Sequence, residues 1–417
     1  MVTVRAAAAA IVLLSATSAH AQTESAPALT PDQLLPASVV RSGHHRVLDD
    51  VRVEGYLAEV DIESDFGTYR TRGLPMILLR VHEVETLAQA VTHFERENQR
   101  LAAELRGQLR VGADSFVDIL ASPLRTTAKL VDQATSNVNQ TLREINTLGA
   151  DSPAGAAGAG LRYESLMPDD PILAGHKRNA ARQLGLDVYS SNPRVQDFLD
   201  AVATARSSGQ AGAGAITVAL PQRAERAVAG GRVQATIEAA VAQRPPGELL
   251  REVQAVLEAT GVEPALAAEF ARAPTLSPRH KAAIALHLRE LDGARNPGAV
   301  VETALAARSE IEALTAVALT RMLARYHEAV SPVVELVSSG HLPVAVSRDG
   351  ALVVALGFDV LYWDASSARV FDAIARHASD RGYPRREVLV LGAVTQQARE
   401  QLAALGFGVE AGQLLDR

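Results

Sequence analysis

The sequence predicts a mostly α-helical α+β protein whose strands lie near its two ends. Three observations support this fold class. Residues 56–63 largely alternate apolar and polar side chains, which indicates a half-buried strand. Apolar residues at alternating spacings of three and four indicate long helices between residues 84 and 148. From Gly340 on, strand-like and helix-like segments alternate, as expected of a small α/β sheet.

The N-terminal strands are expected to form a small hairpin or meander over residues 49–81. A turn at 65–67 follows the first strand, and residues 68–71 form the return strand. After Gly73 and Pro75, we interpret the apolar run 76–81 as a further strand. The preceding residues, 22–48, are rich in Pro, Ser, Thr and Ala, which is typical of a loosely ordered, flexible leader.

The most regular stretch of the chain predicts a long helical hairpin within a unit spanning 49–149. Heptad spacing gives two apolar seams, and a Ser-Pro start at 122–123 opens the second helix. The seams are expected either to bury each other or to form a coiled-coil or partner-binding surface. Their residues are Val84, Leu87, Val91, Phe94, Asn98, Leu101 and Leu105 on the first helix, and Leu124, Val131, Val138 and Ile145 on the second.

The rest of the chain divides into a helical middle, 161–338, and a C-terminal α/β domain, 339–417. Gly- and Ala-rich linkers are expected at 150–160 and 207–215. The last middle helix is predicted over 298–338, with a kink at Pro332. In the C-terminal domain, strands 342–347 and 351–356 meet across an Asp-Gly turn, and 360–363 extends the sheet. Helix 368–379, strand 387–391, helix 396–405 and strand 407–410 follow.

The first 21 residues have the pattern of a cleavable signal peptide. Arg5 gives a short positive region, an apolar run follows, and an Ala-x-Ala site ends at Ala21. The apolar run is shorter than the roughly 20 residues needed to span a bilayer. We therefore expect an exported, periplasmic protein with no transmembrane segment in its mature chain. The absence of cysteine suits an oxidising compartment.

Composition excludes several classes of site. The 417 residues include no cysteine, which excludes disulfides, thiol catalysis and Cys-ligated metals. Forty-one basic and 48 acidic residues give a net charge of −7, which argues against a protein that coats nucleic acid. The histidines do not form a metal-binding motif, and there is no nucleophile elbow, so we predict no metal, cofactor or catalytic residue.

Two C-terminal segments are candidate ligand contacts. The only tryptophan lies in Tyr362-Trp363-Asp364 at the end of a predicted strand, where aromatic side chains serve as core residues or as interface anchors. Gly392 to Thr395 connects a strand to a helix, and the first turn of such a helix can hold a phosphate or carboxylate. The segment 187–193 is polar, and we expect it to supply capping and turn interactions.

Several short segments resemble exported proteobacterial proteins of unknown function. The resemblance covers most of the mature chain and implies export and one recurring architecture, but no activity. It is carried by residues 64–69, 186–193, 276–279, 362–364 and 392–399.

The sequence therefore favours a non-catalytic exported protein that binds an envelope partner or assembles with itself. Its expected contact surfaces are the helical hairpin and the C-terminal sheet. One alternative is a periplasmic hydrolase or transferase acting on an envelope polymer, with acids and histidines gathered from distant segments. Another is a small-ligand sensor that uses residues 392–396.

Overall fold

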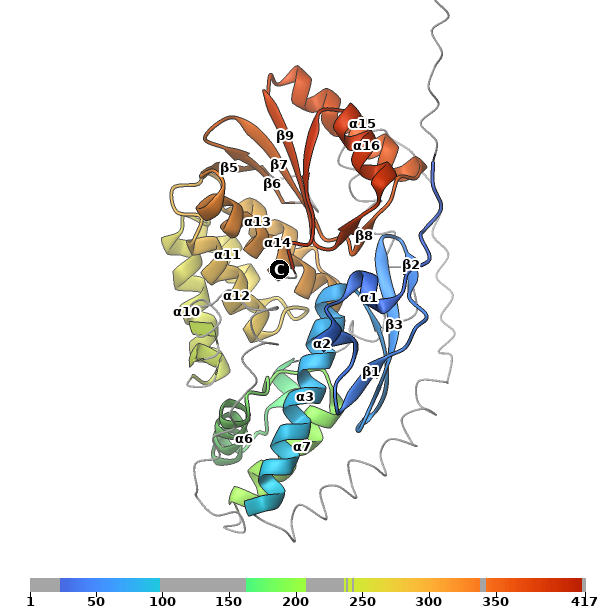
Figure 1. The fold of residues 1–417 in the computed structure, drawn as a ribbon. Helices are drawn as coiled ribbons and strands as arrows, with labels where there is room; N and C mark the ends of the chain where they lie inside the picture. Colours follow the sequence, from blue (N-terminus) through green and yellow to red (C-terminus); the bar gives the residue numbers. More distant parts are fainter. Residues whose placement is uncertain are drawn as a thin grey trace, which may run out of the picture.

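The computed structural model of the protein describes residues 23–97, 163–207, 236–237, 239–241, 244–337 and 343–414. Over these residues the chain is 53% helical and 19% strand, which confirms the predicted α+β, mostly helical fold class. In Figure 1 the C-terminal sheet lies at the top, the N-terminal sheet below it on the right, and the helices of the middle of the chain on the left and at the bottom.

The N-terminal sheet is built around one central strand. β3 pairs with β1 and β2 along one edge and with β4 along the other, always antiparallel. The predicted hairpin is confirmed, including its turn at 65–67. The strands are β1 (His45–Val47), β2 (Arg52–Glu54), β3 (Leu57–Ser64) and β4 (Gly67–Arg72).

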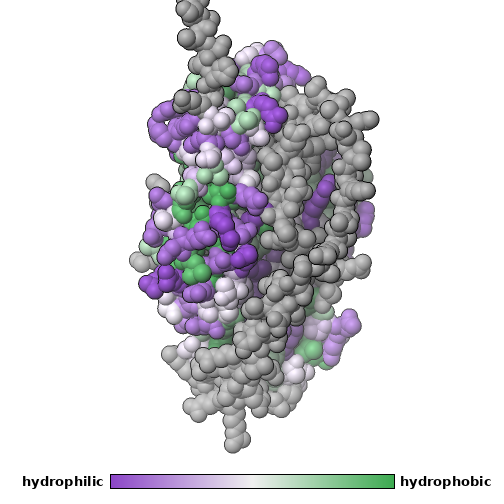
Figure 2. All heavy atoms as spheres, turned by 90° about the vertical axis from the view of Figure 1, so that its right-hand side faces the viewer, coloured by the Kyte–Doolittle hydropathy of each residue, from purple (hydrophilic) through white to green (hydrophobic). Residues whose placement is uncertain are grey.

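The two faces of this sheet differ in chemistry because successive side chains of a strand point to opposite sides. Ala58, Val60 and Ile62 are fully buried on the inner face. The outer face carries ion pairs to both neighbouring strands. Glu59 lies 3.1 Å from Arg52 of β2, and Asp61 lies 3.0 Å from Arg70 of β4. Figure 2 views this side of the molecule and shows hydrophilic residues around a smaller apolar area.

Residues 23–48 differ from the expected loosely ordered leader. They contain α1 (Pro31–Leu34), α2 (Ala37–Val40) and β1, and Leu34, Leu35 and Val39 are buried. Short apolar clusters at helical spacing give this segment enough burial to order it, although Pro, Ser and Ala dominate its composition.

The predicted strand over 76–81 is wrong, because these residues belong to the long helix α3 (Leu74–Glu97). Leu74, Ile77 and Val81 are buried, and the same period continues through the seam residues Val84 and Leu87. Spacings of three and four over a whole window indicate a helix, whereas a short, mostly apolar run taken alone also fits a strand. Pro75 is tolerated because the first turn of a helix needs no N–H donor.

Over its described residues the middle of the chain is mostly helical, as predicted. α6 ends at Gly185, which adopts the left-handed conformation at φ 68°. α7 begins at Pro193. The elements are a 3₁₀ turn (Tyr163–Leu166), α6 (Pro171–Leu184), α7 (Pro193–Ser207), α10 (Pro246–Ala259), α11 (Pro264–Arg272), α12 (Pro278–Arg289), α13 (Gly298–Leu305) and α14 (Glu310–Ala329).

The predicted helix over 298–338 is wrong in its extent. Ser309 caps a new helix by accepting a hydrogen bond from the Glu312 N–H, so α13 and α14 are separate. After α14, Pro332 leads into strand β5 (Val333–Val337), which pairs with the C-terminal sheet. A proline that removes an N–H, followed by Val-Val, favours a strand at a sheet edge over a kinked helix.

The C-terminal sheet has five strands in the order β11-β9-β7-β6-β5, with β7, β9 and β11 parallel and the other pairs antiparallel. The predicted hairpin and the helix–strand alternation after it are confirmed. The elements are β6 (Val344–Ser347), β7 (Ala351–Leu356), α15 (Ala365–Asp380), β9 (Arg385–Val390), α16 (Gln396–Ala404) and β11 (Phe407–Glu410).

Residues 360–363 do not extend this sheet. β8 (Val360–Leu361) instead pairs in parallel with β10 (Ala393–Val394) as a separate two-stranded sheet. This pairing brings the chain after β8 next to the start of α16, so the two predicted ligand-contact segments lie side by side.

Two apolar cores meet at the C-terminal sheet. Leu352, Val354 and Leu356 pack with α15 and α16, whereas Val353 and Ala355 join the larger core of the N-terminal sheet and the middle helices. A strand that is buried on both faces reads as a continuous apolar run, as β7 does. The predicted linkers at 150–160 and 207–215 lie outside the described residues, except for Ser207, which ends α7.

Candidate functional site

The described part of the first predicted seam is internal core. Val84 and Leu87 are fully buried and Val91 is nearly so, all within the larger core of this chain. The other seam positions lie outside the residues whose side chains the structure describes: Phe94, Asn98, Leu101, Leu105, Leu124, Val131, Val138 and Ile145.

The C-terminal candidate residues are brought together, but their rings are not free to stack on a ligand. Trp363 is 2% exposed and stacks on Phe371 at 6.0 Å between ring centroids. Tyr362 is buried beside Tyr56, at 4.9 Å. The aromatic pair therefore belongs to the smaller core of the C-terminal sheet.

Gly392 is required by packing. A Cβ at this position would lie 2.0 Å from the Asp359 carbonyl oxygen and 2.7 Å from the Leu74 side chain. The Gly392 N–H donates to the Phe358 carbonyl at 2.9 Å. The glycine thus permits close backbone approach between two loops.

Asp364 and Thr395 are helix caps with a second partner each. Asp364 accepts the N–H groups of Ser366 and Ser367 at the start of α15, and also the Tyr56 hydroxyl at 2.6 Å. Thr395 accepts the Ala398 N–H at the start of α16, and its hydroxyl donates to the Glu24 carboxylate.

Glu24 is a contact that sequence reasoning missed. One of its carboxylate oxygens accepts the backbone N–H of Trp363 at 2.6 Å and also the Thr395 hydroxyl. The backbone N–H of Glu24 in turn donates to the Trp363 carbonyl at 2.7 Å. A residue of the N-terminal leader therefore fills the place where the sequence indicated an anion. No local signal identifies it, because 371 residues separate Glu24 from Thr395.

A second polar cluster, the central network, joins three distant parts of the chain. Arg80 of α3 donates to Glu83 at 2.6 Å and to the Ser191 hydroxyl at 2.6 Å. Ser191 donates to Glu310, the first residue of α14, whose carboxylate lies 3.6 Å from Arg80. The network thus links α3, the polar segment before α7 and α14.

The segment 187–193 performs the capping and turn role predicted for it, and also contributes to this network. The Ser190 hydroxyl accepts the Asn192 N–H at 3.0 Å, and the Asn192 side chain accepts the Arg194 N–H at 3.0 Å. Ser190 and Asn192 both donate to Glu83, which is 2% exposed.

The electrostatics of the central network show a cation held between two buried acids. Burial raises the pKa of Glu310, while Arg80 and Ser191 act against that rise. Burial of Arg80 lowers its pKa, but Glu83 and Glu310 outweigh this and raise it. Arg80 thus offers both buried carboxylates an opposite charge, and pairing of this kind is the condition under which buried charges are tolerated.

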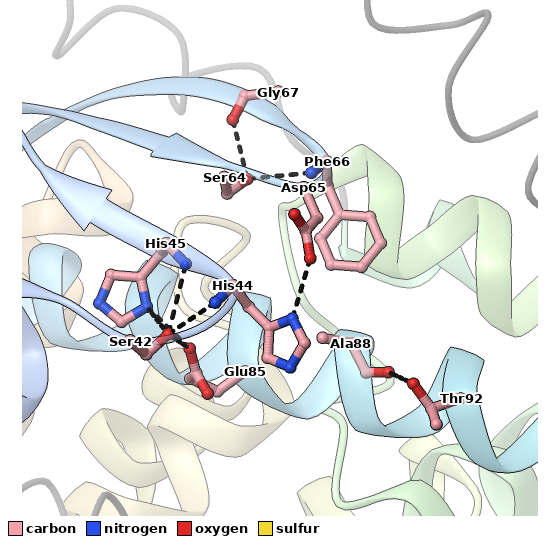
Figure 3. Close-up of polar contacts among 10 residues, drawn as sticks. All are labelled: Ser42, His44, His45, Ser64, Asp65, Phe66, Gly67, Glu85, Ala88 and Thr92. Carbon is pink, nitrogen blue, oxygen red and sulfur yellow. Dashed lines mark hydrogen bonds and ion pairs between the residues drawn. The ribbon is translucent and has the colours of Figure 1, made fainter.

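Ser42, His45 and Glu85 form a third cluster near the N-terminal sheet, shown in Figure 3. Nδ1 of His45 forms hydrogen bonds with Glu85 at 2.7 Å and with the Ser42 hydroxyl at 2.9 Å. Ser42 also donates to Glu85. The other ring nitrogen donates to the Val39 carbonyl at 2.8 Å. From the sequence, His45 is only one of the histidines that form no metal-binding motif.

These three side chains do not form a catalytic relay. In a Ser-His-acid triad the serine and the acid contact opposite nitrogens of the imidazole. Here both contact the same nitrogen, and a backbone carbonyl takes the opposite one. Although partial burial opposes it, the hydrogen bonds from His45 and Ser42 lower the pKa of Glu85. The cluster fixes the loop before β1 onto α3, and the neighbouring His44 pairs with Asp65 at 2.8 Å.

Two further buried groups titrate away from their usual ranges. Burial raises the pKa of Asp359 to about 7. Its carboxylate accepts the N–H groups of Leu74 and Ala58 at 2.9 and 2.7 Å, and these hydrogen bonds lower the pKa by less than burial raises it. Burial, with the charges of Arg279 and Lys281, lowers the pKa of His280 to about 3.

Comparison with known proteins gives no further guide, since no family model, curated protein or solved structure matches the chain. Among the described residues, no group of three or more His, Asp or Glu side chains is arranged to hold a metal ion. Every helix in the described ranges is too short or too polar to traverse a lipid bilayer.

Proposed function

We propose that this is an exported, non-catalytic binding or assembly protein whose contact surface lies in the segment that follows α3. The observation that carries the proposal is the apolar stripe of α3. Its residues through Val91 are buried in the chain's own core, and the sequence continues the same spacing to Leu105. An apolar stripe of this length needs a covering surface along its whole length.

The second seam supports this proposal because it repeats every seven residues at Leu124, Val131, Val138 and Ile145. Such spacing is typical of a helix that packs along a partner helix. The polar clusters described above favour binding over catalysis, since Ser42, His45 and Glu85 contact one another rather than leaving a hydroxyl facing a free base.

Charged substitutions in the second seam test the proposal. Val131→Asp with Val138→Asp places two charges in the stripe, and burying a charge without a partner is strongly unfavourable. We expect the double variant to lose a co-purifying partner or its self-association, as measured by native mass spectrometry of protein isolated from its own periplasm. Its thermal melting should stay close to that of the unaltered chain.

The matched control is Gln133→Asp with Gln140→Asp, which adds the same charge two residues further along, on another side of a helix. This control should retain its partners. A seam variant with unchanged melting and unchanged association would contradict the proposal. A large fall in melting temperature without any partner to lose would instead assign the seam to the interior of this chain.

Export is tested separately. N-terminal sequencing of the protein from a periplasmic fraction should begin at Gln22, directly after the Ala-x-Ala site. A chain that starts at Met1 and stays with the cytoplasmic fraction would overturn this part of the proposal.

A further inference from the structure

The N-terminal leader is held at two points with an exposed stretch between them. Glu24 contacts Trp363 and Thr395, and Leu29 forms a β-bridge with Val51 of the N-terminal sheet. Between these points, Ser25, Ala26 and Ala28 are exposed. Because this stretch buries little apolar surface, its attachment to the C-terminal sheet depends mainly on Glu24.

The contact at Glu24 has the form of one rung of a β-ladder. The Glu24 N–H donates to the Trp363 carbonyl at 2.7 Å, and the Trp363 N–H donates to the Glu24 carboxylate at 2.6 Å. The carboxylate takes the place that a backbone carbonyl has in an ordinary rung. The backbone of Trp363 therefore presents one donor and one acceptor to an extended segment.

The Thr395 hydroxyl adds a second donor to the same carboxylate oxygen. The N–H of Ala398 is already used by Thr395. The site therefore consists of the backbone of Trp363, two residues after β8, and one threonine side chain, with α16 supplying its favourable N-terminal dipole. Asp364 does not compete for these donors, because its carboxylate accepts the N–H groups of α15 and the Tyr56 hydroxyl. Hydrogen bonds to a charged acceptor are the strong ones.

We infer that Trp363 and Thr395 form a recognition site for an extended peptide segment that carries a carboxylate, and that the chain's own leader occupies this site in the structure. The inference goes beyond the proposed function and uses a different surface. A partner that offers an Asp or Glu in an extended segment would exchange with Glu24 at the same three hydrogen bonds.

The leader has a large advantage over any partner in solution. A short tether gives it an effective concentration of the order of millimolar at the site. A free acidic peptide at micromolar concentration should therefore not bind the unaltered chain. The site becomes measurable when the leader is detached, which Glu24→Pro achieves by removing both the carboxylate and the N–H donor.

The experiment adds a peptide with the sequence of residues 22–30 to the full chain carrying Glu24→Pro. Trp363 is the only tryptophan, so its fluorescence reports directly on the site. We expect saturable binding, and about tenfold or greater weakening when the peptide carries Gln in place of its Glu, because a charge-assisted bond is lost. In the same background, Thr395→Ser should retain binding and Thr395→Val should lose it.

Three results would overturn the inference. Equal affinity for the Glu and Gln peptides would show that no carboxylate is recognised, and absence of binding to a folded Glu24→Pro chain would show that there is no site. Concentration-dependent dimers of the unaltered chain that Glu24→Pro abolishes would assign the site to the leader of a second copy. If Glu24→Pro does not fold, Glu24→Gln serves as the test chain, and the Glu peptide should then bind more weakly but still in preference to the Gln peptide.

Discussion

At the scale of single residues, His280 shows how burial makes one side chain sensitive to pH. It caps the start of α12, where its Nδ1 accepts the Ser277 N–H at 3.3 Å. In the folded protein its pKa is about 3, whereas the ordinary value is 6.5. Between these two values the unfolded chain binds a proton that the folded protein does not. The free energy of unfolding therefore falls as the pH drops below 6.5, by about 1.4 kcal/mol per pH unit.

His280→Gln should remove this dependence and keep the cap, since Gln is a favoured residue at this position of a capping box. Between pH 7.5 and pH 5, we expect the unaltered chain to lose about 2 kcal/mol relative to the variant. The measurement is the difference between two urea titrations at each pH. The matched variant is His377→Gln, which makes the same substitution at an exposed histidine and tests whether the effect is specific to the buried one.

The comparison must be made between chains, because Asp359 acts in the opposite direction. Its pKa is raised to about 7, so the folded protein holds a proton that the unfolded chain releases above the ordinary value of 3.8. This carboxyl therefore adds stability as the pH falls from about 7 towards 4. The effects of His280 and Asp359 on the free energy of unfolding have opposite signs below pH 6.5. An unaltered chain whose free energy of unfolding hardly changes with pH is therefore compatible with both pKa shifts. A His280→Gln chain that loses stability on acidification as the unaltered chain does would contradict the assignment of His280.

At the scale of elements, α3 carries the central network, and Arg80 is its positive centre. Arg80→Met would leave Glu83 and Glu310 buried without a counter-charge. Removing one partner of a buried ion pair costs about 3–5 kcal/mol, and we expect a loss of that size in urea unfolding. Arg46→Ala is the contrasting variant, because Arg46 and Asp49 pair at 3.2 Å on the surface and should contribute less than about 1 kcal/mol. Equal losses in the two variants would show that the network does not stabilise α3.

The elements also show which parts of the fold a single sequence predicts. The hairpin β6–β7 and the run from α15 to β11 follow from turn residues and alternation, because their determinants are adjacent in sequence. The start of α3 was missed because a six-residue run with five apolar side chains fits either a strand or a helix until the buried seam after it is included. β5 was missed because Pro332 was interpreted as a kink in a continuing helix, although Val333 and Val334 after it favour a strand.

The candidate site divides in the same way. The turn at 187–193 uses neighbours within a few residues and was predicted. The caps at Asp364 and Thr395 are equally local, although the sequence was interpreted there as a pair of ligand contacts. Glu24 and Glu310 find partners more than 100 residues away, and Glu83 adds Ser190, 107 residues away, to its local pair with Arg80. No periodicity or spacing encodes such contacts, and only the fold reveals them.

At the scale of the whole molecule, Tyr56 connects the two sheets. It lies in the turn between β2 and β3 at φ 67°, a conformation that side chains other than Gly, Asn and Asp rarely adopt. Its ring is 1% exposed and stacks on Phe358 at 4.5 Å, and its carbonyl accepts the N–H groups of Asp359 and Val360. Tyr56 thus anchors the N-terminal sheet in the C-terminal core, beside the hydrogen bond from the Ala58 N–H to Asp359.

Tyr56→Ala should loosen the N-terminal sheet from the rest of the protein. Truncating a buried aromatic residue costs about 3–5 kcal/mol. In hydrogen exchange measured by mass spectrometry, we expect β1–β4 to lose protection while α6 and α7 keep theirs. Tyr56→Phe removes only the hydrogen bond to Asp364 and should cost about 1 kcal/mol. A uniform loss of protection over all elements would show that Tyr56 supports global stability rather than the junction of the sheets.

The position of Tyr56 also has a consequence for the order in which the protein folds during synthesis. Its partner Asp364 is synthesised 308 residues later, and the partners of Glu24 at 363 and 395 follow Glu24 by 339 and 371 residues. The hairpin β3–β4 can close as soon as it emerges, because its strands are adjacent. Its anchorage must wait for about 300 further residues, a delay of tens of seconds at ordinary rates of translation. Denatured full-length chain meets no such delay, so refolding in vitro and folding during synthesis begin from different sets of available partners.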